Sequence, residues 1–265
     1  MRTVRLNAPD DFESWRDAAR ALLLAQVPPG EIAWQSGTAD LFAATTTLPS
    51  GNGMLAVPRD FVALAKSVVC HSDPERFALL YALLWRVQRT KGLIHDHADP
   101  LVRRCEMLAK GVRRDIHKMR AFVRFRELDG NYVAWFEPDH HIVRVNAAFF
   151  VRRFASMKWS ILTPEVSIHW DGNMLGEGPG ALKADAPSGD PVEEMWKTYY
   201  ASTFNPARVK IGAMLKEMPR KYWKNMPETA LVPQLLATAQ ARVAGMIERS
   251  GAQGENGKAT SGTTT

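Results

Sequence analysis

Hydrophobic residues recur every three or four positions through most of the region before residue 120, a spacing that places them on one face of an α-helix. Where such a run begins after Asp or Pro and ends at Gly or Pro, the boundaries of the helix are predicted as well. The elements predicted here are a strand over residues 3–6, a helix from Asp10 or Asp11 to about Gln26, a strand over 32–34, helices opened by Pro58 and Pro74, and a helix over 98–119. A loop rich in Gly, Ser, Thr and Asn is expected between residues 35 and 57.

Alternation of hydrophobic and polar residues replaces the helical spacing after residue 121, as expected of strands with one buried face. Turn residues at 129–131 and 171–173 predict hairpins. The predicted elements are strands over 122–126, 132–138, 140–145, 158–163 and 166–170, a helix over 147–157 capped by Asn146, and a helical region from Pro191 to about Arg249. The fold class predicted is therefore α+β, with a mixed or antiparallel central sheet, packed helices and a helical C-terminal part.

A single α+β domain is predicted over residues 1–249, with the Gly- and Pro-rich loop 173–191 as the candidate internal boundary. Residues 250–265 contain no apolar side chain larger than alanine, so we expect a disordered tail there. The N-terminus does not resemble a secretion signal, Cys70 and Cys105 lie in apolar helical patterns, and no long uncharged apolar run occurs. These features predict a soluble cytoplasmic protein without a membrane partner.

Positive charge is concentrated in two windows, although the whole chain carries a net charge of only +6. Residues 103–158 contain 13 Lys and Arg against 6 Asp and Glu, and residues 196–224 contain 7 against 1, so these windows carry +7 and +6. The rest of the chain must then carry −7, which makes it acidic. Such segregation of charge indicates that the basic residues bind a polyanionic partner and do not serve solubility alone.

The segment 113–127, RRDIHKMRAFVRFRE, shows how the basic residues are arranged. On the predicted helix they lie opposite the apolar stripe, and on the strand expected after it Arg124 and Arg126 continue the same surface. Aromatic residues such as Trp159, Tyr222 and Trp223 can stack on unpaired bases. The residues expected to contact nucleic acid are Arg103, Lys110, Arg113, Arg114, His117, Arg120, Arg124, Arg126, Asn205, Arg208, Lys210, Lys221, Tyr222 and Trp223.

Histidine and acidic residues suggest two alternative kinds of site, a metal site and a catalytic centre. The segments 95–97 and 139–141 supply metal-ligand types, but no H-E-x-x-H or cysteine-rich spacing accompanies them. His117 lies among arginines that favour its neutral form, so it is a candidate base. No Walker loop, G-x-S-x-G motif or iron–sulfur spacing occurs in the sequence, and neither a metal nor a cofactor is predicted.

Several long strings resemble one bacterial family linked to DNA repair and DNA metabolism. They are RRDIHKMRAFVRFRE, YVAWFEPDHHI, FFVRRFASMKWSILTP, WKTYYASTFNPARVK and MPRKYWKNMPE, and the resemblance covers roughly residues 1–245. Members of that family occur alone, encoded beside a radical SAM protein of DNA-repair type, or fused to the N-terminus of UdgX-type uracil-DNA-glycosylase-like proteins. The resemblance therefore implies DNA as the polyanion and one of these proteins as a partner. It does not imply uracil recognition, because the residues responsible belong to the glycosylase half.

The function predicted from the sequence is that of a DNA-binding accessory protein in DNA repair or DNA metabolism. One alternative is a DNA-processing enzyme centred on His117 or on Asp139, His140 and His141. Another is a protein-interaction adaptor whose basic face docks an acidic partner, for instance a repair enzyme. If DNA is the partner, the two basic windows should converge on one surface.

Overall fold

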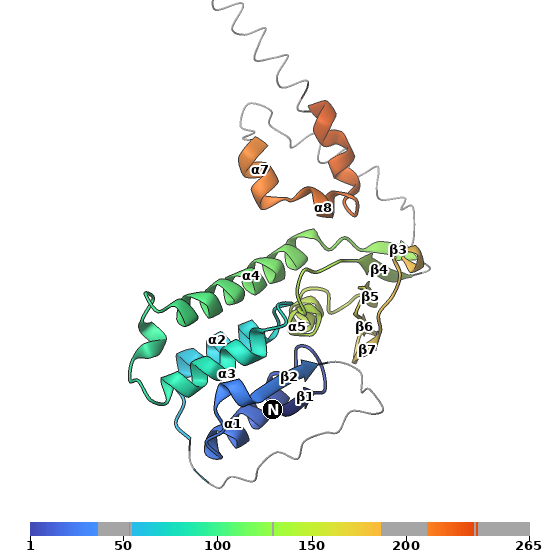
Figure 1. Cartoon of the computed structure of the whole chain (residues 1–265). Coiled ribbons are helices and arrows are strands. Elements are labelled where there is room, and N and C mark those ends of the chain that lie inside the picture. The colour runs from blue at the N-terminus through green and yellow to red at the C-terminus, as the bar shows by residue number, and fades with distance from the viewer. Residues whose placement is uncertain (37–52, 54, 129, 187–210, 236, 238–265) are drawn as a thin grey trace, which may run out of the picture.

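The structure, a computed structural model, describes residues 1–36, 53, 55–128, 130–186, 211–235 and 237 (Figure 1). Its N-terminal elements are β1 (Arg2–Leu6), α1 (Phe12–Leu24), η1 (Pro29–Glu31), β2 (Ile32–Ser36), α2 (Arg59–Val69), α3 (Arg76–Val87), η2 (Leu93–His95) and α4 (Pro100–Phe122). The elements that follow are β3 (Arg126–Leu128), β4 (Asn131–Trp135), α5 (Val143–Arg153), β5 (Trp159–Leu162), β6 (Val166–Trp170), β7 (Leu175–Pro179), η3 (Lys183–Asp185), α7 (Ile211–Glu217), α8 (Arg220–Trp223) and η5 (Pro227–Leu231). Packed helices and a mixed sheet make an α+β fold, which confirms the predicted class.

The N-terminal elements enclose a core of aromatic and aliphatic side chains. β1 and β2 pair in parallel, and α1, α2 and α3 contribute buried residues to the same core. Trp15 of α1 is buried, and its ring centre lies 6.3 Å from that of Trp34 and 6.4 Å from that of Phe61. α1 begins where predicted, because Asp11 accepts a hydrogen bond from the backbone N–H of Ser14 at 2.9 Å and so caps the helix.

A five-stranded mixed sheet follows, in the order β3-β4-β5-β6-β7. β3 and β4 form the hairpin predicted around residue 130, and β5, β6 and β7 are antiparallel neighbours. β4 and β5 run parallel, so the chain crosses over between them, and α5 lies in that connection. The ring of Phe150 on α5 packs 6.2 Å from that of Trp159 on β5, and this contact fixes α5 against one face of the sheet.

α4 is the long helix that joins the two halves (Figure 1). Its 23 residues span about 34 Å. Asp99 caps the first turn by accepting hydrogen bonds from the backbone N–H groups of Leu101 at 2.9 Å and Val102 at 3.1 Å. Cys105 is buried in the N-terminal core, whereas Met119 is buried in the core under the sheet. The exposed face of one helix therefore runs along both halves.

The described C-terminal residues pack onto the end of α4 through α8, as Figure 1 shows. Tyr222 is only 2% exposed, and its ring stacks on Phe136 at 5.4 Å and lies 5.1 Å from Phe122 of α4. Its hydroxyl donates to Oδ1 of the buried Asp115 at 3.3 Å. These contacts hold the second basic window against the first, although the two are far apart in the sequence.

The strand predicted over residues 122–126 is wrong. α4 continues to Phe122, and β3 begins only at Arg126. Phe122 packs on Tyr222, and this tertiary contact favours one more helical turn over the local alternation. Val123 then leaves the helix in an extended conformation.

Two further predictions around the sheet are wrong. Residues 140–145 do not form a strand, because α5 begins at Val143. Asn146 lies inside α5, where it is buried and accepts a hydrogen bond from Arg120 instead of capping the helix. Residues 173–191, predicted to be a loop, contain β7, which pairs with β6. β7 is mostly exposed, so its sequence lacks the hydrophobic alternation by which a strand is identified.

Some predictions concern residues outside the described ranges. These are the tail 250–265, most of the loop 35–57, and the C-terminal helical region apart from residues 211–235 and 237. The domain boundary at residue 249 therefore stays a prediction. Within the described ranges, no helix is long and apolar enough to cross a membrane.

Candidate nucleic-acid interface

The exposed face of α4 carries many of the residues predicted to contact nucleic acid. The other face of α4 packs into the core through apolar side chains that recur at three- and four-residue spacing from Val102 to Met119. α4 contains seven Lys or Arg residues and two acidic residues, and one of these acids, Asp115, is buried. The exposed face is therefore strongly basic. The predicted residues that it presents are Arg103, Lys110, Arg113, Arg114, His117 and Arg120.

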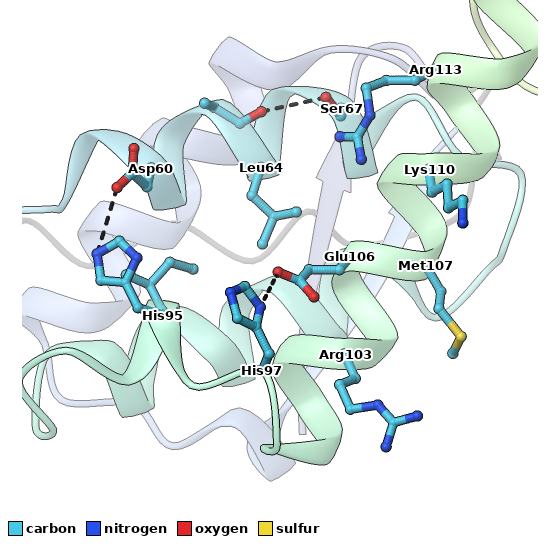
Figure 2. A pocket seen from close by; sticks show the side chains of 12 residues that line it. Asp60, Leu64, Ser67, His95, His97, Arg103, Glu106, Met107, Lys110 and Arg113 are labelled. Carbon is cyan, nitrogen blue, oxygen red and sulfur yellow. Dashed lines mark hydrogen bonds and ion pairs between the residues drawn. The ribbon is translucent and has the colours of Figure 1, made fainter.

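A groove of about 680 Å³ lies between α2 and the N-terminal half of α4 (Figure 2). His97 Nδ1 lies 2.8 Å from Glu106 Oε1, and His95 Nε2 lies 3.6 Å from Asp60 Oδ2. The two pairs are separate, and within the described residues no three His, Cys, Asp or Glu side chains are placed to hold a metal ion. Carboxylates thus offset part of the positive charge here. The groove is lined by the histidines His95 and His97 and by the charged residues Asp60, Arg103, Glu106, Lys110 and Arg113.

A smaller cavity of about 150 Å³ lies beyond the C-terminal end of α4, and we name it the basic cavity. Arg124 and Arg126 belong to the first basic window, whereas Lys224 belongs to the second. The two windows therefore meet in one cavity at the end of α4, as their predicted convergence requires at this point. The cavity is lined by Arg124, Arg126, Val133, Trp135, Lys183, Ala186, Lys224 and Asn225.

Carboxylates position the lysines of the second window. Lys224 Nζ donates to Oε2 of Glu137 at 2.5 Å, and Trp135 Nε1 donates to Oε1 of the same carboxylate at 3.0 Å. Burial raises the pKa of Glu137, but these two hydrogen bonds and the positive charges of Lys224 and Lys183 together outweigh burial, and the pKa is lowered overall. Lys221 forms an ion pair with Asp139. Both lysines are thereby held beside the end of α4.

Lys118 lies where the positive charges of the two windows come together. Its pKa is lowered first by burial and then by the positive charges of Arg114 and Lys221. Arg114 belongs to the first window and Lys221 to the second, so cations of both windows lower the pKa of Lys118. Lys118 Nζ also lies 5.8 Å from the ring centre of Tyr222. Cations of both windows therefore lie close together where α4 meets α8, with the carboxylates of Asp139 and Asp115 among them.

Two of the three aromatic residues predicted to stack on bases are buried in the core. Trp159 and Tyr222 are each 2% exposed, so neither ring offers a face to a base, and this part of the prediction is wrong. Trp223 is half-buried, and its Nε1 donates to the carbonyl oxygen of Met218 at 3.0 Å, while the guanidinium of Arg220 lies 5.8 Å from its ring centre. Asn205, Arg208 and Lys210 lie outside the described residues.

The Asp-His-His string predicted as an alternative catalytic centre is dispersed. The ring of His140 lies against that of His71, with 4.0 Å between ring centres and 33° between planes, and its Nδ1 lies 3.0 Å from the hydroxyl of Ser72. His141 faces another direction, with Nδ1 at 2.6 Å from Oε2 of Glu165. The aspartate of the string is the residue paired with Lys221 described above. The three side chains thus contact three different partners and do not meet at a common point.

Both rings of the His71–His140 pair favour the neutral form. Burial, reinforced by the electrostatic interaction with His140, lowers the pKa of His71 to about 4. Burial also lowers the pKa of His140. His117 is exposed on α4, within the basic face.

Residues 74–228 match the family model DUF4130, which is described as a domain of unknown function. The chain belongs to this family. The matched region contains α4, the whole five-stranded sheet and α8, and therefore all four cations of the basic cavity. No curated protein and no solved structure matches the sequence.

Two residues that shape this interface of the DUF4130 region were not predicted from the sequence. Lys183 lines the basic cavity from η3 but lies outside both basic windows, so no local pattern marks it. Asp115 is buried, and its Oδ2 accepts hydrogen bonds from the backbone N–H groups of Asp139 at 2.8 Å and His140 at 3.0 Å. A signal for Asp115 was present, because it lies on the apolar stripe of α4, where a carboxylate needs hydrogen-bond partners.

Proposed function

We propose that the chain binds DNA, as an accessory protein in DNA repair or DNA metabolism, through the surface formed by α4, the basic cavity and α8. The observation that carries this proposal is the basic cavity, where Arg124 and Arg126 meet Lys183 and Lys224 within about 150 Å³. Four cations gathered around one cavity, one of them paired with Glu137, form a positive patch that attracts a phosphate group. A phosphate backbone is a chain of such groups, and α4 extends the cationic surface from the cavity.

Family resemblance supports DNA as the polyanion. It also supports a DNA-repair-type radical SAM protein or a uracil-DNA-glycosylase-like protein as the enzyme that this chain assists. In this proposal the chain holds the nucleic acid and the partner performs the chemistry. The dispersed arrangement of the 139–141 side chains favours binding over a catalytic role for that group.

The test is fluorescence anisotropy with labelled single- and double-stranded oligonucleotides across a salt series. Arg114→Ala and Lys183→Ala should each weaken binding similarly for all sequences. Each should reduce the slope of log affinity against log salt by about 0.9 on duplex DNA and about 0.7 on single strands, because one phosphate contact is lost.

Lys91→Ala is the matched control, since it removes the same charge from an exposed position outside the proposed surface. It should leave both affinity and slope near those of the unmodified protein. Absence of binding at about 50 mM salt would overturn the proposal, because non-specific contacts alone give dissociation constants of roughly 10⁻⁴–10⁻⁶ M at physiological salt and tighten below it. Equal slopes for Lys183→Ala and Lys91→Ala would remove the basic cavity from the interface.

A further inference from the structure

A second cavity, which we name the aromatic cavity, lies beside the basic cavity and shares Arg124 with it. Its volume is about 540 Å³, within the roughly 300–1,000 Å³ of typical small-molecule sites. Tyr132 of β4 lines the aromatic cavity and its neighbour Val133 lines the basic cavity, because successive residues of a strand point to opposite faces. The two cavities therefore lie on the two faces of the β3–β4 hairpin, with Arg124 common to both.

Aromatic rings form the apolar part of this cavity. Phe125, Tyr132, Phe149 and Phe154 are each half-buried, so part of each ring is accessible. Phe125 and Phe154 meet edge to face, with 5.1 Å between ring centres and 76° between planes. The ring of the buried Phe150 packs against two of these rings, with 5.2 Å between its centre and that of Phe149 and 6.3 Å between its centre and that of Phe154. The rings are thus fixed by packing and offer a stable stacking surface.

Arginines are placed next to these rings. The guanidinium of Arg120 lies 4.8 Å from the ring centre of Phe149, and that of Arg153 lies 5.4 Å from the ring centre of Phe154. Arg120 is held in position, because its Nε donates to Oδ1 of the fully buried Asn146 at 2.8 Å. Rings for stacking beside cations for a phosphate are the combination by which proteins bind unpaired nucleotides.

We propose that the aromatic cavity takes one unpaired nucleobase of a DNA strand whose backbone lies on the basic surface. This inference rests on the proposed function and deepens it, since it names single-stranded or extruded bases as the form of DNA that is bound. Arg120 and Arg153 contact the phosphates next to the base, and Arg124 leads the strand to the basic cavity. An uncharged apolar ligand would fit the rings but would leave the arginines without a role.

Glu127 gives the cavity a base preference. It is the acidic residue among those that line the cavity, and it lies directly opposite Tyr132 in the β3–β4 pairing. A carboxylate accepts a hydrogen bond from the exocyclic amino group of cytosine, and adenine and guanine carry such a group as well. Thymine has none. Cytosine should therefore be bound more tightly than thymine in this cavity.

The experiment compares ten-nucleotide single strands of dC with an abasic deoxyribose-phosphate strand of the same length, by competition anisotropy at low salt. The unmodified protein should bind the dC strand about five-fold or more tightly than the abasic strand, because stacking adds to backbone contacts. Phe149→Leu should abolish that difference, and Glu127→Gln should abolish the preference for dC over a dT strand.

The neighbouring residues Arg152 and Arg153 provide a matched pair of variants. Both are exposed and lie in the last turn of α5, but only Arg153 lines the aromatic cavity. Arg153→Gln should weaken binding of the dC strand several-fold, whereas Arg152→Gln should change it little. This comparison decides the inference even where Phe149→Leu fails to fold, which a thermal melt would show.

Two results would separate the inference from the proposed function. If the abasic strand binds as tightly as the dC strand, the nucleobase site is wrong while binding of DNA through its backbone stands. If neither strand binds, both proposals are wrong. Equal effects of Arg153→Gln and Arg152→Gln would also overturn the nucleobase site.

Discussion

Replacing the buried Asp115 by alanine should destabilise the protein by about 2–3 kcal/mol. The side chain is 3% exposed, and it accepts hydrogen bonds from two backbone N–H groups and from the hydroxyl of Tyr222. A buried donor left without a partner costs about 1–3 kcal/mol, and the lower end of that range applies to each donor here because the two backbone N–H groups are only partly buried. Two gains offset part of this loss. Alanine is a better helix former by up to about 0.7 kcal/mol, and the variant no longer buries a carboxyl group whose pKa is raised by burial and by Asp139.

The free energy of unfolding is measured by urea titration. Thermal melts provide a second measurement, in which the melting temperature should fall by roughly 5–10 °C. Asp115→Asn keeps an acceptor oxygen for the two N–H groups, so it should lose less than half as much. Asp139→Ala is the control, because its ion pair with Lys221 is exposed and such pairs contribute about 0–1 kcal/mol. If Asp115→Ala is no less stable than Asp139→Ala, the claim that Asp115 holds α8 and the 139–140 backbone on α4 is refuted.

Two further predictions concern the contact between α4 and the histidine pair His71 and His140. Gly111→Ala should destabilise the protein, because the added Cβ would lie 3.1 Å from Nε2 of His140, and Ser72 holds that ring in place. This clash should exceed the gain of up to about 1 kcal/mol in helix propensity. Gly212→Ala is the control, since no atom lies within 4 Å of its added Cβ, and it should not destabilise the protein in the same urea titration. His71 has a lowered pKa of about 4, so the unfolded chain binds a proton first and stability should fall as the pH drops from about 6.5 towards 4. His71→Gln should reduce this loss in urea titrations at several pH values, and an unchanged pH dependence would contradict the assignment.

Helices were predicted well where their determinants are local. Asp11 caps α1 within three residues of itself, and the spacing of apolar residues on α4 fixed both its core face and its basic face. β7 was not predicted, because its residues are held by backbone pairing with β6 and bury almost no side chains. A strand of this kind leaves no hydrophobic pattern in the sequence.

The candidate interface was predicted in its charge but not in its aromatic residues. Clustered arginines on one helix face can be recognised from periodicity alone. Whether an aromatic ring is exposed depends on distant contacts: Tyr222 is buried because it meets Phe136 and Phe122, both far away in the sequence. Phe149 and Phe154, which line the aromatic cavity, lie in the first basic window beside Arg152 and Arg153, but they were not among the aromatic residues predicted to stack on bases.

Acidic residues inside the first basic window position the lysines of the second. Lys221 and Lys224 of the second window are paired with Asp139 and Glu137, whereas Lys183 completes the basic cavity from outside both windows. A lysine that already has a carboxylate partner holds fewer counterions to release, so it adds less to DNA affinity than an unscreened cation does. If the chain binds DNA as proposed, Lys221 and Lys224 should serve mainly to position α8 against α4, and exposed arginines of α4 such as Arg113 and Arg114 should contribute more of the attraction for phosphate.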